Sequence, residues 1–353
     1  MKLKLFVIFG IEVLLITAAA ICFASEEVVT GPAGIVQSAD QYWVTFSGDC
    51  SCDDIFVMQI DGAGNVIKQP KAVLDIATYG TGASALLKLG TSKLILLHWK
   101  DSTFLARAII SKSTLKASGI KTTGLYSYES EFMEVTQNAS GNFLIAEDAL
   151  DGTLSAYKIS KKGIPQTQAS QVSPQAPMSS DEASISSDGQ IVVTNRYSAT
   201  STKEKLYVQP LDNNGAPKGS PTLIAKYKDV ESVDATNPLP DGNRFVVYTV
   251  DAGTVPDDRL YLQVVNPQGK KVGQKKLINT PPDRGEDSQT VAIDPKGQFV
   301  LFTMGGDQYG CPGNDILVYQ ALASNGTPNG TVKVLADCSL VSDDIMNLDI
   351  VQE

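Results

Sequence analysis

The sequence predicts an all-β fold of repeated small sheets, and three observations support this prediction. First, one unit recurs along the chain, with clear copies at Gln41–Leu74, Gly189–Ile224, Gly242–Ile278 and Gly297–Ala336. Second, Val, Ile, Tyr and Thr are abundant and no stretch has helical periodicity. Third, Gly-containing turns separate the β-rich segments within each unit. A period of roughly 40–50 residues with several short strands per unit is typical of a β-propeller.

Each unit is expected to form four antiparallel strands, called A to D from the centre outward. Strands A and B are joined by a tight turn, because Asp-Gly and Pro-x-Gly sequences supply the positive φ of a short hairpin. The turns lie at residues 39–40, 89–90, 139–141, 188–189, 240–242 and 295–297. The strand B segments are residues 42–44, 94–96, 143–145, 191–193, 245–247 and 299–301. Their nearly unbroken apolar character predicts burial on both faces of the sheet.

Strand C alternates more clearly, with Tyr157, Tyr207 and Tyr261 in equivalent places. Strand D is expected to be short, at residues 223–224, 277–278 and 334–335. The second unit, around Phe104–Ile110, is the most divergent.

The C-terminal segment predicts how the repeat closes. Asp344–Ile350 has the pattern of a strand A, but no strands B, C and D follow it. We therefore expect Ile345–Val351 to complete the blade that begins near Gln41, which gives six four-stranded blades. In the alternative, Gly34–Ser38 supplies that inner strand and the C-terminal segment adds a partial seventh blade.

Three turn phrases, Ser186–Val193, Leu239–Tyr248 and Asp294–Phe302, resemble the Ser-Pro-Asp-Gly repeats of TolB-like periplasmic propellers. The resemblance covers the turn and the following strand of these units and is one of fold. It implies an exported bacterial propeller, often a binding scaffold, and it assigns no catalytic residues.

The N-terminus predicts export. Lys2 and Lys4 precede an apolar run, Leu5–Ile21, and small residues end at Ala24. This is the pattern of a signal peptide spanning residues 1–24, which leaves 25–353 as a single propeller domain in a secreted or periplasmic protein. The alternatives are an uncleaved N-terminal anchor and a lipoprotein modified at Cys22.

The formal net charge is −10, from 29 Lys and Arg against 39 Asp and Glu. This balance argues against a nucleic-acid partner and against a membrane partner beyond an N-terminal anchor, because both need a basic surface. The expected partner is a protein or small molecule, including a cationic one.

Four cysteines follow the signal segment: Cys50, Cys52, Cys311 and Cys338. An even number in an exported chain predicts two disulfides. In a propeller all four lie in loops at one end of the first and last blades, which are neighbours. We favour Cys311–Cys338, with Cys50–Cys52 either a small loop or part of a cross-linked seam. A zinc site is the alternative.

Acidic residues gather where strand A begins in every unit but the second. The candidate ligand or cation-binding residues are Glu131, Asp181, Glu182, Glu231, Glu286, Asp287, Asp343 and Asp344. Such a ring of carboxylates at one mouth of the channel suits a hard cation such as Ca²⁺ or a basic ligand; no other cofactor is evident. In the alternative interpretation these are solvated acids that keep exposed strand edges from pairing.

The sequence provides little catalytic machinery. His98 is the only histidine, and no Gly-x-Ser-x-Gly motif occurs. We therefore predict a binding or interaction protein with no catalytic residues, whose ligand face is formed by the acidic B–C and D–A loops. The alternative is a hydrolase or lyase that uses paired carboxylates, with or without a divalent cation, at the channel mouth.

Overall fold

The structure is a computed structural model. It describes residues 40–49, 54–75, 84–100, 104–126, 133–138, 141–148, 153–172, 183–186, 188–196, 203–251, 258–279, 290–306, 309–311, 314–340 and 344–353. The predicted signal segment, Cys50 and Cys52 lie outside these residues. Among the described residues, no helix has the length and apolarity needed to cross a bilayer.

The described residues form six antiparallel sheets of four strands each. The first sheet has the order β24 (Asp344–Gln352), β1 (Gln41–Asp49), β2 (Asp54–Asp61), β3 (Val66–Asp75). The second contains β4 (Ser84–Leu89), β5 (Lys93–Lys100), β6 (Phe104–Ser111) and β7 (Ala117–Tyr126). The third contains β8 (Met133–Asn138), β9 (Gly141–Asp148), β10 (Thr153–Ile159) and β11 (Pro165–Gln171).

The fourth sheet contains β12 (Ala183–Ile185), β13 (Ile191–Arg196), β14 (Glu204–Pro210) and β15 (Thr222–Tyr227). The fifth contains β16 (Ser232–Ala235), β17 (Arg244–Asp251), β18 (Asp258–Val265) and β19 (Lys271–Asn279). The sixth contains β20 (Val291–Ile293), β21 (Phe299–Gly305), β22 (Asp315–Ala321) and β23 (Lys333–Ala336). The all-β prediction is confirmed, and every predicted strand B segment lies within β1, β5, β9, β13, β17 or β21.

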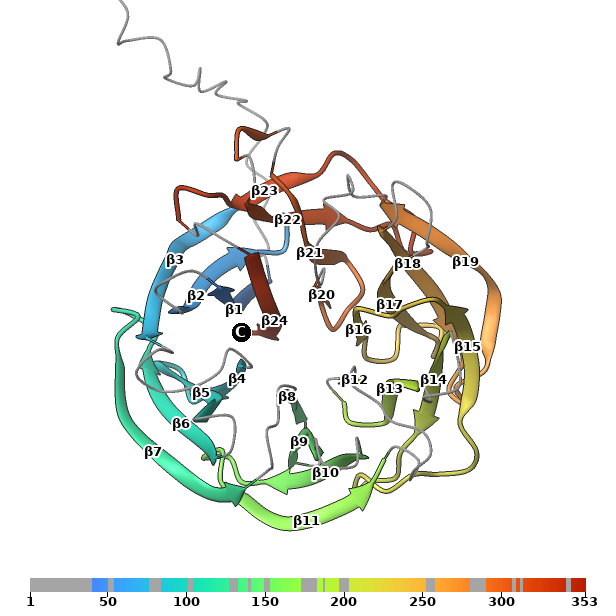
Figure 1. Cartoon of the computed structure of the whole chain (residues 1–353), viewed down its shortest axis with the longest axis horizontal. Coiled ribbons are helices and arrows are strands. Elements are labelled where there is room, and N and C mark those ends of the chain that lie inside the picture. The colour runs from blue at the N-terminus through green and yellow to red at the C-terminus, as the bar shows by residue number, and fades with distance from the viewer. Residues whose placement is uncertain are drawn as a thin grey trace, which may run out of the picture. The chain divides into compact units, whose positions relative to one another are not determined.

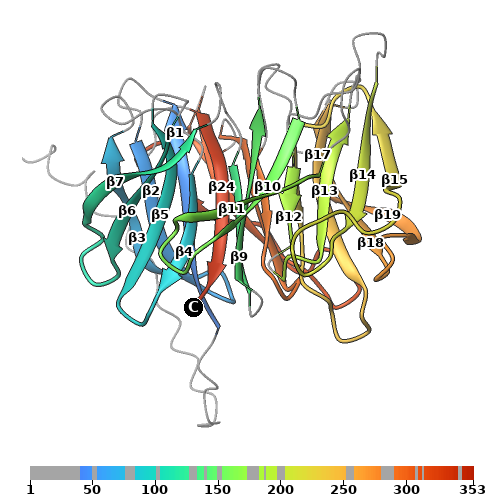
Figure 2. The ribbon, with the colours of Figure 1, turned by 90° about the horizontal axis from the view of Figure 1, so that it is seen from below.

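In the unit formed by residues 39–353, the sheets follow one another around a central axis (Figure 1), with β4, β8, β12, β16, β20 and β24 innermost. Each innermost strand contacts the next, from β4 to β24, and β24 contacts β4. Figure 2 shows the strands running up and down between two end surfaces. The antiparallel register therefore puts the A–B and C–D turns at one end and the B–C and D–A loops at the other.

The C-terminal strand β24 pairs with β1, from Tyr42 opposite Gln352 to Asp49 opposite Asp344. The register shifts between Thr45 and Ser47. This is the pairing that the sequence predicted for residues 345–351.

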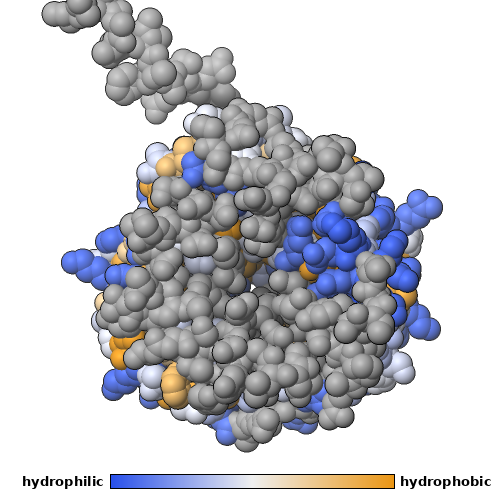
Figure 3. All heavy atoms as spheres, viewed as in Figure 1, coloured by the Kyte–Doolittle hydropathy of each residue, from blue (hydrophilic) through white to orange (hydrophobic). Residues whose placement is uncertain are grey.

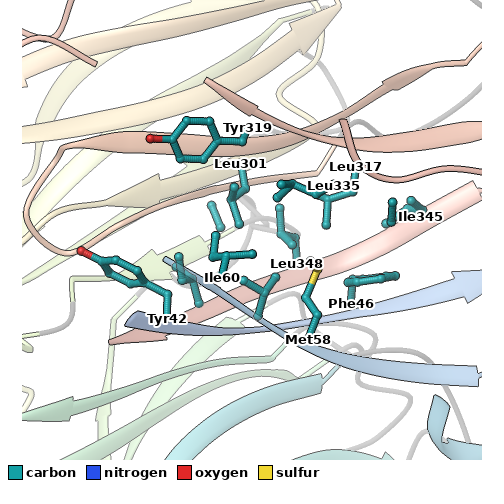
Figure 4. Close-up of a cluster of buried hydrophobic side chains, with 14 of the residues drawn as sticks. Tyr42, Phe46, Met58, Ile60, Leu301, Leu317, Tyr319, Leu335, Ile345 and Leu348 are labelled. Atoms are coloured by element: carbon teal, nitrogen blue, oxygen red, sulfur yellow. The ribbon is translucent and has the colours of Figure 1, made fainter. Parts of the chain in front are cut away.

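The core is divided into layers, because each sheet packs its two faces against its two neighbours. The layer between the first and sixth sheets includes Tyr42, Phe46, Tyr319, Ile345 and Leu348, and it is drawn in Figure 4. Strand B residues alternate between layers, so that both faces are apolar. The prediction of burial on both faces is confirmed: Ile191–Arg196 and Phe299–Gly305 are buried along their whole length.

The turn phrases that reveal the repeat have a structural cause. Asp61, Asp212 and Asn266 occupy equivalent C–D turns, and each accepts hydrogen bonds from backbone N–H groups two and four residues later. Gly64 follows in the first of these turns with φ of 76°, and a Cβ there would lie 2.7 Å from the ring of Tyr319 in the sixth sheet. Glycine is therefore needed both for the turn and for the contact between sheets.

The glutamine that ends the strand C phrase is also structural. Gln209, Gln263 and Gln320 each donate from Nε2 to backbone carbonyls of their own C–D turn. These side chains are buried. Their amides donate to carbonyls on both sides of the turn and so connect the end of strand C to the segment that leads into strand D.

The prediction that strand D is short is confirmed for β23, which has four residues, but it is wrong for the longer outer strands of other sheets. β19 spans Lys271–Asn279 and β7 spans Ala117–Tyr126. The apolar dipeptide taken as strand D is only one end of an edge strand whose other side chains are largely exposed and polar. Lysines on such edges, as on β3, β15 and β19, oppose pairing with a further strand.

Cys311 and Cys338 form a disulfide, with Cα atoms 5.5 Å apart. It joins the loop after β21 to the segment after β23 and lies against the core layer of the sixth sheet. This prediction is confirmed.

Candidate functional site: the acidic end and the inner strands

Most of the predicted acidic ring lies outside the described residues. This applies to Glu131, Asp181, Glu182, Glu286, Asp287 and Asp343, and of Asp344 only the backbone is described, at the start of β24. Glu231 is half-buried directly before β16, and its backbone N–H donates to the carbonyl of Thr249 at 3.2 Å. The ring as a cation or ligand site therefore remains a prediction.

The strand register nevertheless brings further acids to the end that carries Glu231. They lie at the B–C and D–A ends of strands: Asp49, Asp54, Asp75, Asp148, Glu204, Asp229, Asp251, Asp258, Asp315 and Asp344. Basic residues at the same strand ends are fewer: Lys100, Arg196, Lys203, Lys228 and Arg259. We call this surface the acidic end. In Figure 3 the largest described area, on the side of β17 and β18 in Figure 1, is hydrophilic.

Acids at the opposite end serve the turns that contain them. Asp61 and Asp212 accept from their own turn N–H groups at 2.8–2.9 Å. Asp294 accepts from the N–H of Phe299 at 2.9 Å, and Asp241 accepts from that of Asn243 at 3.0 Å. At this end the carboxylates therefore stabilise turns. Carboxylates at the acidic end also have structural partners, since Glu204 accepts from the N–H of Val230 and Asp315 accepts from that of Ile345.

Two carboxylates that the sequence did not single out lie on the innermost strands. Asp234 on β16 accepts from the N–H of Ile293 on β20 at 2.7 Å and from the hydroxyl of Ser184 on β12 at 2.7 Å. Asp349 on β24 accepts from the N–H of Leu86 on β4 at 2.7 Å. Each of these two carboxylates therefore connects the innermost strand of one sheet to the innermost strand of the next sheet. The two strands belong to different sheets and do not pair through their backbones.

Hydroxyl groups make the same type of connection. Ser232 on β16 accepts from the N–H of Val291, and Thr290 accepts from that of Leu348, both at 3.2 Å. Because hydroxyls and acids both serve in this role, the first function of Asp234 and Asp349 is to join neighbouring sheets.

Burial raises the pKa of these groups. The pKa of Asp349 rises from 3.8 to about 7, to which the Asp234 carboxylate contributes. The pKa of Asp234 rises to about 6 for the same reason, although the residue is only half-buried. The pKa of Asp294, which is fully buried in its turn, also rises to about 6. Hydrogen bonds to the carboxylates oppose the rise in each case but do not cancel it.

These pKa values predict that the protein is more stable in mild acid. An aspartate with a folded-state pKa near 7 binds a proton that the unfolded chain, with a pKa near 3.8, has already lost. The free energy of unfolding therefore falls as pH rises from about 4 to about 7, by about 2–4 kcal/mol for Asp349 alone. Urea unfolding at several pH values measures this slope. Asp349→Asn should reduce the slope of the unfolding free energy against pH, whereas Asp241→Asn, in an exposed turn, should leave this slope unchanged. Equal slopes for the two variants would contradict the role given to Asp349.

The sequence contains a weak signal for Asp234 and Asp349, the two aspartates of the innermost strands. Each stands alone between apolar residues in a predicted strand A, in Ser-Val-Asp-Ala and Asn-Leu-Asp-Ile. A single acid in an innermost, apolar strand has no solvent to face and needs a partner on the next sheet. Sequence reasoning instead favoured the more numerous acids a few residues earlier.

The structure also shows where other residues that could act in catalysis or metal binding lie. His98 is buried in β5, two residues before the end of that strand, and lies opposite Ser84, the first residue of β4. Among the described residues, no three His, Cys, Asp or Glu side chains are grouped so that they could hold a metal ion.

No family model and no curated protein matches this sequence. Solved structures do. A chain of the nidogen/laminin complex matches with a TM-score of 0.54 at 9% identity, over 88% of this chain and 98% of that one. AofleA from Arthrobotrys oligospora matches with a TM-score of 0.53 at 10% identity, over 88% and 85% of the two chains. At such identities the likeness shows the fold alone, which is of β-propeller type. The TolB-like resemblance is likewise one of fold.

Proposed function

We propose that this chain is an exported, six-bladed β-propeller that binds a cationic ligand or a lysine-rich protein at its acidic end, without turnover. The six blades are the six four-stranded sheets, and β24 closes the ring by completing the blade of β1. The continuous contacts among the innermost strands support this architecture.

Export is supported by the disulfide. Cys311 and Cys338 form the kind of cross-link that persists in oxidising compartments and is rare in reducing ones. It accords with the signal peptide predicted at residues 1–24 and with a secreted or periplasmic location.

The observation that carries the proposed binding function is the excess of acidic over basic residues at the acidic end. At the turn end, carboxylates are occupied by the N–H groups of their own turns. At the acidic end, acids cluster at strand ends beyond the number of basic residues, and the ion pair described there, Lys228–Asp251, involves a largely exposed lysine. An excess of negative charge at one end of the molecule attracts and orients a cationic partner.

Binding of a fluorescent octalysine peptide, followed by anisotropy at low and high salt, tests this function. Neutralising three acids at the acidic end (Asp229→Asn, Glu231→Gln, Asp251→Asn) is expected to weaken binding about tenfold at low salt. The control neutralises three acids at the turn end (Asp61→Asn, Asp212→Asn, Asp241→Asn) and has the same net charge. Its turns should survive, because Asn266 already fills the equivalent place. Equal weakening by both variants would reduce the effect to net charge and reject the acidic end as the site.

A hydrolase or lyase is the second candidate. The observation that favours it is the electrostatic coupling of Asp234 and Asp349, two inner-strand carboxylates with raised pKa values. Both are engaged by backbone N–H groups of neighbouring strands, so we rank this function below binding.

A further inference from the structure

Three tyrosines from two neighbouring sheets meet between the β12–β15 sheet and the β16–β19 sheet. Tyr227 ends β15, Tyr248 lies on β17, and Tyr261 is directly opposite Tyr248 on β18. The ring centroids are 5.7 Å apart for Tyr227 and Tyr261, 5.8 Å for Tyr248 and Tyr261, and 5.9 Å for Tyr227 and Tyr248. Each ring thus contacts the other two, and we call this group the tyrosine cluster.

The tyrosine cluster already holds an alkylammonium group. Nζ of Lys275, on β19, lies 3.8 Å from the ring centroid of Tyr261 and 4.5 Å from that of Tyr227. It also donates a hydrogen bond to the Tyr227 hydroxyl. The faces of aromatic rings attract cations, and several rings around one ammonium group form the arrangement that recognises organic cations.

Lys275 is an exposed residue of an edge strand, where the pairing of β18 with β19 is irregular. In the part of the chain that is described, no carboxylate forms an ion pair with it. Partial burial lowers the pKa of Lys275, because the rings displace water without supplying a negative charge. The lysine is therefore held by the rings and can leave towards solvent.

A neighbouring pair shows the contrast. The guanidinium of Arg196 lies 4.5 Å from the ring centroid of Tyr207, but Arg196 is only 8% exposed. That cation is part of the interior and cannot be exchanged without disturbing the sheet. The exposed position of Lys275 makes exchange feasible.

Tyr248 supplies an unused polar group beneath the cluster. It is fully buried, and its hydroxyl has no hydrogen-bond partner among the described residues. Buried hydroxyls are normally paired, and an unpaired one needs an explanation. The hydroxyl of Tyr248 therefore gives the tyrosine cluster a polar group that Lys275 does not use.

We propose that the tyrosine cluster is a binding site for an organic ammonium group, either a lysine-like primary ammonium or a quaternary ammonium, with Lys275 as its exchangeable resident. The site lies between two sheets and uses none of the residues of the acidic end. It therefore stands whether or not the proposed function is correct. The net charge of −10 raises the local concentration of such cations.

The test uses Lys275→Ala, which vacates the cluster, with n-butylammonium and tetramethylammonium chloride as probes at constant ionic strength. Calorimetry should show binding to the variant about tenfold tighter than to the wild type, where Lys275 competes as a tethered ligand. The methyl proton resonances of tetramethylammonium should move upfield on binding, because they would lie over ring faces. The stronger of the two probes identifies which kind of ammonium group the site prefers.

Two control variants separate binding at the tyrosine cluster from binding elsewhere on the protein. Lys276→Ala removes the adjacent lysine, which contacts the carbonyl of Asn325 and none of the three rings, and it should bind the probes no better than the wild type. Adding Tyr261→Leu to Lys275→Ala should abolish binding. Equal responses to n-butylammonium and neutral n-butanol, or no difference between Lys275→Ala and Lys276→Ala, would overturn the proposal. Lys275→Ser, which also vacates the rings, replaces Lys275→Ala if the latter does not fold.

Discussion

A chain that ends at residue 343, and so lacks β24, is expected to be unfolded or molten at room temperature. β24 supplies the innermost strand of the first sheet and the buried side chains Ile345, Leu348 and Ile350. Burial of each of these contributes about 1.5–3 kcal/mol. The pairing with β1 and the bond from Leu86 to Asp349 are lost as well. Together these losses approach the whole stability of a typical domain, about 5–15 kcal/mol. Near-ultraviolet circular dichroism and resistance to proteolysis measure the result.

A single substitution tests the same seam more gently. Leu348→Ala is expected to destabilise the protein by about 2–4 kcal/mol, because Leu348 packs in the layer between the first and sixth sheets. Leu277→Ala is the matched control, since Leu277 is 49% exposed on the edge strand β19. This substitution should lower the free energy of unfolding by much less than Leu348→Ala does. A truncated chain that keeps a native melting transition would contradict closure by β24 and the six-bladed architecture with it.

Asp188→Asn is expected to destabilise the protein by about 3–5 kcal/mol. Asp188 lies in the A–B turn of the fourth sheet, and Arg244 begins β17 of the fifth. The guanidinium donates to both carboxylate oxygens, at 2.8 Å and 2.6 Å, and also to the carbonyl of Thr236. The Arg244 side chain is only 5% exposed. Asparagine keeps one acceptor oxygen but carries no charge, so a cation would remain buried between two sheets with only neutral acceptors.

Urea unfolding of a double-mutant cycle measures this coupling. The double variant Asp188→Asn with Arg244→Met should be less destabilised than the sum of the single variants, because it leaves no buried charge unpaired. Lys228→Ala is the comparison, since Lys228 is 65% exposed in its pair with Asp251 and its loss should cost less than about 1 kcal/mol. Additive single effects would show that the ion pair between the sheets does not act as a unit.

Much of this architecture could be read from the repeat. The Asp-Gly and Asn-containing turns predicted where strands begin, since the chemistry of these turns is local: Asp212 binds N–H groups two and four residues away. The pairing of β24 with β1 was also predictable, because a strand A pattern at the C-terminus had no other partner. The disulfide followed from the neighbourhood of the first and last units and from cysteine parity.

The functional groups were less predictable. The acidic end follows from strand register, so that its composition could be foreseen, although most of the predicted ring lies outside the described residues. Asp234 and Asp349 could not be assigned a role, because their partners Ile293 and Leu86 belong to other units. The tyrosine cluster was missed for a similar reason: Tyr261 was noted as a repeated strand C residue, but its contacts with Tyr227 and Lys275 cross from one strand or sheet to another.

The sequence by itself determined the strands, their turns, the apolar faces and the acidic balance of the chain, because each depends on residues within one unit or on composition. Only the tertiary structure decided which carboxylates are buried with raised pKa values, which ion pair joins two sheets and where an ammonium group lies over two tyrosine rings. These features arise where the face of one sheet meets the next. Alternation along a strand says which face a residue occupies, but it does not say which residue of the neighbouring sheet stands opposite.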